Sequence, residues 1–143
     1  MKKSHVLFIA VAFFAAGLVC SAAATADEAR EKAAVASSGT WLALVDKGSY
    51  DKAWDQASAY FKGAVTKAGL EASLKGVRDP LGKVLSRKLK SKTYSKTLPG
   101  APDGEYVIIQ YDTSFQKKAA AVETVTPMLD KDGKWRVSGY YIK

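Results

Sequence analysis

Cysteine and histidine are almost absent from this sequence. The 143 residues contain one of each, Cys20 and His5, so residues 27–143 contain neither. That part of the chain therefore has no disulfide bond, thiol nucleophile, serine–histidine–aspartate triad or usual zinc site, because each needs one of these residues. Any acid–base chemistry there must come from Asp, Glu, Lys or Tyr. We expect no metal ion and no cofactor, and the lack of a glycine-rich turn between a strand and a helix excludes a Rossmann fold and a P-loop.

The first 26 residues have the order of a secretory signal peptide. Lys2 and Lys3 precede an uncharged apolar run over residues 6–19, and small residues over 21–26 provide a cleavage site after Ala26. The run of 14 residues is shorter than the roughly 20 that a transmembrane helix needs. We therefore expect residues 1–26 to be removed and the protein to be periplasmic or secreted.

This leader leaves two alternatives open. One is a retained membrane anchor, and the other is a lipoprotein acylated at Cys20. Val19 argues against the second, because a lipobox has a small residue directly before its cysteine. The expected remainder, residues 27–143, is long enough for one domain with an ordinary apolar core.

The first half of the remainder has helical periodicity. We expect a helix over residues 28–47 with Gly48 at its C-terminus, and a second helix over 50–65 that is capped by Ser49. A short third helix over 70–77 should end before Pro80, because the residue before proline avoids the helical region.

The second half has the period of strands. We expect strands over residues 84–94, 105–115, 118–129 and 135–142, joined by tight turns, with Pro127 at an edge or a bulge. Helices followed by a run of strands indicate the α+β class. The predicted fold has two to three N-terminal helices packed on a curved four-stranded antiparallel sheet, a meander.

Positive charge is concentrated in one segment. Residues 75–96 hold eight of the 22 lysines and arginines, and Asp79 is the only acid among them. In the strand over 84–94, the lysines Lys88, Lys90 and Lys92 should share one face, opposite to Leu85, Arg87 and Leu89. They are candidates for a surface that binds an anionic envelope component, or they protect a sheet edge from pairing. Nucleic acid is an unfavoured partner, because no aromatic residues alternate with these lysines.

Two charges lie on strand faces that should point inward. Arg87 lies between Leu85 and Leu89, and Glu123 shares a face with alanine and valine. A buried charge must be paired or lose its ionisation. We expect either a structural ion pair or a pair that orients a ligand in a pocket, with Tyr111 and Tyr141 as further candidates for that pocket. Tyr140 and Tyr141 must face opposite sides of their strand.

Four strings of the sequence together resemble one family. They are PLGKVLSR at 80–87, LPGAPDGEY at 98–106, AVET at 121–124 and WRVSGYY at 135–141. The chain thereby resembles the domain-of-unknown-function family numbered 4019, which implies a small exported bacterial protein without an established activity. The order of helices and strands also resembles the cystatin-like and nuclear-transport-factor-2-like architectures, an analogy that carries no function.

Three functions follow from these features as hypotheses. The leading one is an exported, non-enzymatic binding or interaction module, with a pocket between helices and sheet for a small molecule or an envelope protein. The first rival is an isomerase or lyase that uses Glu123 or Asp112 with a tyrosine. The second is a basic adaptor for envelope polyanions. A pocket of at least about 300 Å³ containing Glu123 would favour a ligand or an enzyme, and a filled concavity with exposed lysines would favour the adaptor.

Overall fold

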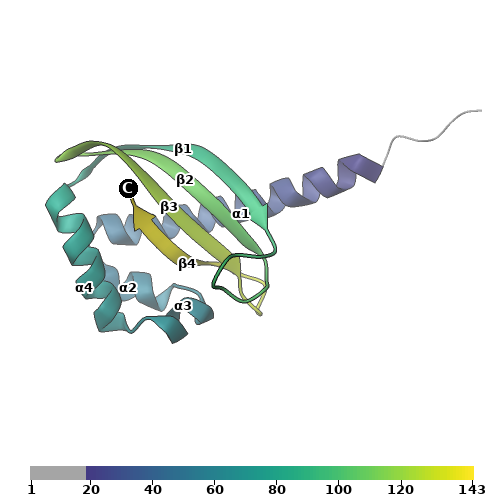
Figure 1. Ribbon diagram of the computed structural model, residues 1–143, viewed down its shortest axis with the longest axis horizontal. Coiled ribbons are helices and arrows are strands. Elements are labelled where there is room, and N and C mark those ends of the chain that lie inside the picture. The colour runs from purple at the N-terminus through teal and green to yellow at the C-terminus, as the bar shows by residue number, and fades with distance from the viewer. Residues whose placement is uncertain (1–18) are drawn as a thin grey trace, which may run out of the picture.

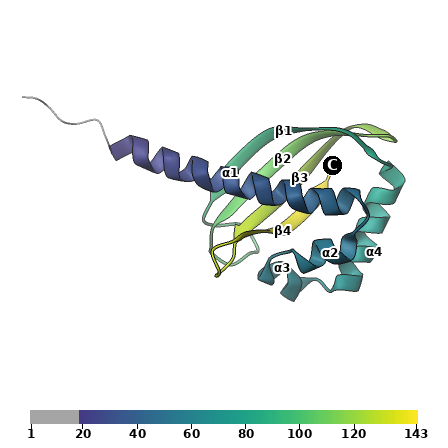
Figure 2. The same ribbon diagram turned by 180° about the vertical axis from the view of Figure 1, so that it is seen from behind.

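The computed structural model describes residues 19–143, with side chains from Ala22 onward. The predicted leader therefore lies mostly outside the described residues, and its last part begins the first helix, α1 (Val19–Asp46). Figures 1 and 2 show that α1 runs across one face of the sheet and that its N-terminal part extends beyond the strands. Within residues 19–143, no helix has both the length and the apolar composition that a membrane span requires.

The end of α1 follows the prediction. Gly48 has φ +73°, in the left-handed region that favours glycine. Its N–H donates to the carbonyl of Val45 at 3.0 Å, and the N–H of Ser49 donates to the carbonyl of Leu44 at 2.9 Å. These two bonds are the Schellman arrangement, which satisfies carbonyls that the helix leaves free.

The predicted second helix over 50–65 is wrong, because two short helices stand in its place. They are α2 (Tyr50–Asp55) and α3 (Ala59–Ala64). The break occurs at Ser58, whose side chain accepts from the N–H of Phe61 as an N-cap, while its own N–H donates to the carbonyl of Val137 on the last strand. Ser49 precedes α2 but makes no capping bond with its side chain.

The last helix before the sheet is α4 (Lys67–Arg78), which is close to the predicted 70–77. The side chain of Thr66 caps its start by accepting from the N–H of Gly69. The chain then passes through a short 3-10 turn, η1 (Asp79–Leu81), so the helix ends before Pro80 as expected.

The sheet is the predicted four-stranded antiparallel meander, in the order β1-β2-β3-β4. The strands are β1 (Val84–Ser95), β2 (Tyr106–Phe115), β3 (Lys118–Leu129) and β4 (Trp135–Ile142). Because β3 is paired on both sides, Pro127 is not at an edge. It lies at a register shift between Thr126 and Pro127, which is the bulge that the prediction allowed. The α+β class is therefore confirmed.

The expected alternation along β1 is interrupted. Register shifts occur between Val84 and Ser86 and between Leu89 and Ser91. Each extra residue moves the following side chains to the other face of the sheet. As a result Lys92 lies opposite the buried Ile109, on the helix-covered face and not beside Lys88.

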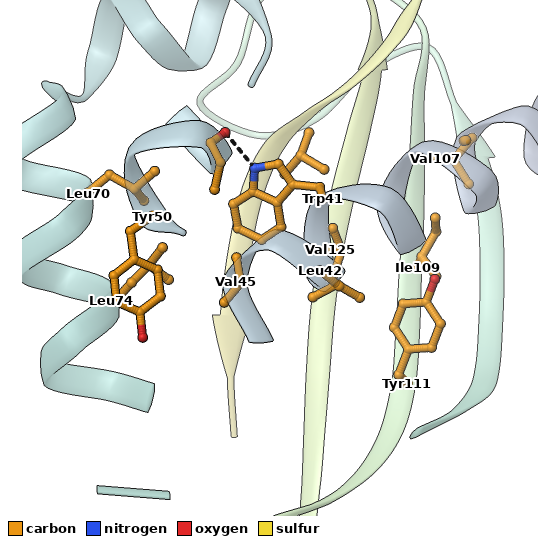
Figure 3. Close-up of a cluster of buried hydrophobic side chains, with 13 residues drawn as sticks. Trp41, Leu42, Val45, Tyr50, Leu70, Leu74, Val107, Ile109, Tyr111 and Val125 are labelled. Atoms are coloured by element: carbon orange, nitrogen blue, oxygen red, sulfur yellow. Dashed lines mark hydrogen bonds between the residues drawn. The ribbon is translucent and has the colours of Figure 1, made fainter. Parts of the chain in front are cut away.

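The core lies between α1 and the sheet. Figure 3 shows α1 side chains, with Trp41 and Leu42 among them, packed over buried residues of β2 and β3 such as Ile109 and Val125. The Trp41 indole N–H donates to the carbonyl of Ala53 at 2.9 Å, which ties α2 to α1. The Trp41 ring also meets the Tyr140 ring edge-on, with centroids 5.2 Å apart.

Candidate functional site

A cluster of charged side chains lies on the helix-covered face of the sheet, beside the C-terminal end of α1. Arg87 of β1 donates Nε–H to Oε1 of Glu123 on β3 at 2.8 Å, and Nη1–H to Oδ2 of Asp46 on α1 at 2.7 Å. The structure therefore brings the two sequence candidates together and adds Asp46. The Glu123 side chain is 0% exposed, the Arg87 side chain 17% and the Asp46 side chain 28%, so exposure rises from the sheet toward the helix end.

Both carboxylate oxygens of Glu123 are occupied. Oε1 also accepts from the Thr113 hydroxyl at 2.6 Å. Oε2 accepts from the Tyr140 hydroxyl at 2.6 Å and from Nη2 of Arg87 at 3.2 Å. Each oxygen thus has two donors from the protein, which is how a buried carboxylate is stabilised without solvent.

A second arginine completes the cluster. Arg78, at the end of α4, donates Nη2–H to Oδ1 of Asp46 at 2.7 Å and contacts the Tyr140 hydroxyl with Nη1 at 3.4 Å. Its guanidinium lies over the Phe115 ring, 5.1 Å from the centroid. The side chain is 5% exposed, and its Nε–H has no partner among the described residues. Two guanidinium groups therefore face two carboxyl groups, and α1, α4, β1 and β3 are joined through them.

The surroundings lower the pKa of Asp46 and raise the pKa values of Arg78, Arg87 and Tyr140. Burial by itself would raise the pKa of Asp46, but the bonds from Arg87 and Arg78 outweigh it and the pKa is lowered. Burial opposes the charge of Arg87, and its bonds to Asp46 and Glu123 nevertheless raise its pKa. Burial, then the nearby Glu123, raises the pKa of Tyr140, so this hydroxyl stays protonated as a donor.

Two tyrosine candidates are placed elsewhere than expected. Tyr111 is opposite Glu123 in the register, but its hydroxyl bonds with Ser38 of α1 at 3.2 Å. Tyr141 is 50% exposed and lies opposite Thr124, on the face away from the helices. The tyrosine that reaches Glu123 is Tyr140, its neighbour.

The sequence contained signals for the members that prediction missed. Arg78 continues the buried stripe of Leu70 and Leu74 at a spacing of four residues, so its side chain should be buried. Asp46 is an acid at a helix C-terminus, where the helix dipole disfavours it unless a cation is near. Neither signal names the partner, which only the packing of the helices on the sheet determines.

The three lysine candidates do not form one row. Lys88 is exposed and lies opposite Asp112 on the open face of the sheet. Lys90 is at the second register shift and is 3.4 Å from the Asp112 carboxylate. Lys92 lies on the helix-covered face, where it pairs with Glu31 of α1 at 3.3 Å. The expectation that all three share a face is therefore wrong, because the shift between Leu89 and Ser91 reverses the alternation.

Two surface hollows are relevant to binding. The first, of about 490 Å³, is on the open face near the β2–β3 turn, and Lys88, Asp112 and Lys143 are among the residues that line it. The second, of about 200 Å³, lies between α4 and β4. Its lining is mainly apolar and consists of Phe61, Leu70, Ser73, Leu74, Val77, Tyr140, Tyr141 and Ile142. Glu123 lines neither hollow, since its side chain is fully buried.

Among residues 19–143, no group of three or more His, Cys, Asp or Glu side chains is arranged to hold a metal ion. The fold and the cluster together define a small α+β protein with a charged cluster between its helices and its sheet. The chain belongs to the DUF4019 family, described as a protein of unknown function, whose model matches residues 37–140. The matched range contains all five side chains of the cluster formed by Asp46, Arg78, Arg87, Glu123 and Tyr140. No curated protein and no solved structure gave a significant match to the chain.

Proposed function

We propose that the protein is an exported, non-enzymatic interaction module that binds an anionic component of the cell envelope. The observation that carries this proposal is a group of exposed lysines at the β2–β3 end of the sheet, which we call the basic rim. Among the described residues, none of the members of the basic rim forms an ion pair. The basic rim consists of Lys83, Lys88, Lys117, Lys118 and Lys143.

The state of Glu123 supports a binding role over an enzymatic one. A general base must reach the proton that it removes, but both Glu123 oxygens are engaged and the side chain is fully buried. Its tyrosine partner, Tyr140, has a raised pKa and is therefore a poor proton donor to a substrate. Asp112 is exposed, but Lys90 is its ion-pair partner and no described tyrosine bonds to it. The isomerase or lyase hypothesis thus lacks an assembled site.

Export is proposed from the leader pattern at residues 1–26. The described side chains of this segment, from Ala22 to Ala26, are exposed. Among the described side chains of α1, those from Ala22 onward, the first fully buried one is Ala34, so cleavage after Ala26 would remove none of the described core. Glu123 is fully buried and lines neither hollow described above, and the lysines of the basic rim are exposed, which favours an adaptor for anionic partners over a ligand pocket around Glu123.

Chromatography on heparin resin tests the proposal. A variant with Lys83→Glu, Lys88→Glu and Lys117→Glu should elute at clearly lower salt than the original protein, because fewer bound counterions are released. The matched control carries Lys52→Glu, Lys62→Glu and Lys67→Glu on the helices and should elute close to the original protein. Equal elution of the original protein and the basic-rim variant would refute the proposal.

The hollow between α4 and β4 supports a second candidate, in which a partner protein inserts one apolar side chain there. Its volume of about 200 Å³ is below the range of roughly 300–1,000 Å³ that is usual for small-molecule pockets, but it suits a single anchoring residue. Val77 and Tyr141 at its rim are 47% and 50% exposed. Native mass spectrometry of protein purified from the envelope should show a bound partner, and the Val77→Asp variant should have lost that partner. If the Val77→Asp variant still carries the partner, this hollow is not the binding site.

A further inference from the structure

We infer that the free edge of β1 binds an extended acidic segment of an envelope protein, which adds to the sheet as a further strand. This inference rests on the proposed function and specifies the class of its anionic partner. β1 is at one end of the strand order, and Figures 1 and 2 show α1 crossing the face of the sheet and not lying along the outer side of β1. An edge strand presents unpaired backbone N–H and C=O groups to a partner strand.

The strand at the opposite edge, β4, has backbone partners among the helices. The carbonyl of Val137 accepts from the N–H of Ser58 at 2.9 Å, and the carbonyl of Trp135 accepts from the Ser37 hydroxyl at 2.7 Å. Among residues 19–143, no hydrogen bond joins the backbone of β1 to an element other than β2. None of the 12 residues of β1 is buried. The edge at β1 is therefore the one on which another strand can pair.

The side chains of β1 carry positive charge and no negative charge. Its charged residues are Arg87, which belongs to the buried cluster, and Lys88, Lys90 and Lys92. Two copies of β1 would repel each other, and lysines on an edge strand are known to prevent such pairing. The same charges attract a strand of opposite sign, because charge determines both which partner is accepted and which is rejected. An acidic segment is thus the occupant that the charge of β1 fits.

The register places these lysines on both faces of the sheet. Lys88 lies opposite Asp112 on the open face and forms no ion pair among the described residues. Lys90 has an exposed contact with Asp112 at 3.4 Å, of a kind that contributes little. Lys92 lies opposite Ile109 on the helix-covered face. A partner that lies against one face meets only some of these lysines, whereas an added strand has side chains on both faces.

Exposed leucines on β1 indicate that the added segment also has apolar side chains. Leu89 is 48% exposed and lies opposite Tyr111 on the helix-covered face, and Leu85 is 65% exposed at the first register shift. Edge protection does not explain them, because exposed leucines on an edge strand favour association. An apolar neighbour on an added strand would cover Leu89. Since Lys88 faces the other side, the segment that fits β1 alternates acidic and apolar residues.

Binding of synthetic peptides tests this inference on protein purified from the envelope of cells that produce the full chain. The probe is a peptide of about eight residues in which glutamate alternates with valine. The matched control has proline in place of each valine, which keeps the charge but prevents a regular ladder, because proline has no N–H. By titration calorimetry, the valine peptide should bind about tenfold more tightly than the proline peptide. Equal affinities, or no binding of the valine peptide, would overturn strand addition.

Amide hydrogen exchange locates the bound peptide. The valine peptide should slow the exchange of outward-facing amides of β1, because their N–H groups gain partners, and should leave the amides of β4 unchanged. Protection confined to the turn between β2 and β3 would place the peptide away from the edge and overturn the inference. Slow exchange of these β1 amides without peptide, in a protein that sediments as a dimer, would assign the edge to a second copy and overturn it as well.

Lysine variants separate this inference from the proposed function. Lys88→Gln with Lys90→Gln should weaken binding of the valine peptide by roughly fivefold, because two cross-strand charge pairs are lost. Lys62→Gln with Lys67→Gln, on α3 and α4, removes the same charge and should change little. Equal effects of the two variants would count against strand addition, while the basic rim would stand. The heparin comparison concerns the proposed function alone, and unchanged elution of the basic-rim variant refutes that function even where the peptide binds.

Discussion

The helix-covered face of the sheet has two parts that are stabilised in different ways. Under the middle of α1, Trp41 and Leu42 cover Ile109 and Val125, and the contacts are apolar (Figure 3). Glu123 lies two residues before Val125 in β3, on the same face of the sheet, and the cluster with the two arginines begins there. In the apolar part, each side chain contributes to the free energy of unfolding in proportion to the apolar area that it buries. In the charged part each group depends on its partners, because a buried charge without them is strongly unfavourable.

The largest effect is expected from Glu123→Ala. This change leaves Arg87, Thr113 and Tyr140 without their common acceptor inside the protein. Breaking a buried pair by removal of one partner costs about 3–5 kcal/mol, and we expect a loss in that range from urea unfolding curves. Glu123→Gln keeps the volume of the side chain and one acceptor oxygen, and should lose less. A loss of less than about 1 kcal/mol for Glu123→Ala would contradict the dependence on partners.

Ile109→Ala should have the next largest effect. Ile109 is 0% exposed beneath α1, so truncation removes buried methyl groups and leaves a cavity. The expected loss is about 2–4 kcal/mol by the same unfolding measurement. Ile108, half-buried on the opposite face of the same strand, is the matched control, and its change to Ala should cost less than about 1.5 kcal/mol. Equal losses at the two positions would show that α1 does not cover this face.

The three tyrosines provide a graded series of smaller effects. Tyr140→Phe keeps the ring contact with Trp41 and removes the donor to Glu123, a bond to a charged group worth about 1.5–3 kcal/mol. Tyr111→Phe removes a bond to Ser38, worth about 0.5–1.5 kcal/mol. Tyr141→Phe should leave stability unchanged, since Tyr141 is exposed. A different order of the three stability losses, measured by thermal unfolding, would contradict the hydrogen bonds described for these hydroxyls.

Asp46→Asn should have an effect on stability that depends on pH. The folded-state pKa of Asp46 is lowered, so its stabilisation is fully present above the unfolded value of about 3.9. It is lost as the pH falls through the lower folded-state pKa, because protonation then removes the same charge that the substitution removes. The difference in unfolding free energy between original and variant should shrink below about pH 4, while that of Ile109→Ala should stay constant. A difference that does not vary with pH would exclude Asp46 as an ionised partner.

Periodicity and turn residues were enough to predict the sheet. The strands begin and end within a residue or so of the predicted ranges, because Gln116, Lys117 and Gly133 mark turns directly in the sequence. The helical region was less predictable. The apolar stripe over 50–65 suggested one helix, but the bond from Ser58 to Val137 breaks it, and that bond depends on where β4 lies. Tertiary contact here overrides local periodicity.

The candidate site was predictable only where a charge interrupted an apolar face. Arg87 and Glu123 met that condition and were predicted to lie inward. Asp46 and Arg78 come from helices, and the spacing of residues does not show how those helices approach the sheet. Alternation along a strand does not determine which of Tyr140 and Tyr141 faces inward, so the prediction named Tyr141 instead of Tyr140. The position of Lys92 depends on a bulge in β1, for which the sequence carries no clear mark.

A double-mutant cycle between Arg87 and Glu123 tests most directly whether the charged part of the face is one mutually dependent unit. Arg87→Met, Glu123→Gln and the double variant would be compared with the original protein by urea unfolding at neutral pH. The two changes should be coupled by at least about 1 kcal/mol, with the double variant losing less than the sum of the single losses. Additivity within about 0.5 kcal/mol would show that the two residues stabilise the fold independently and would contradict this account.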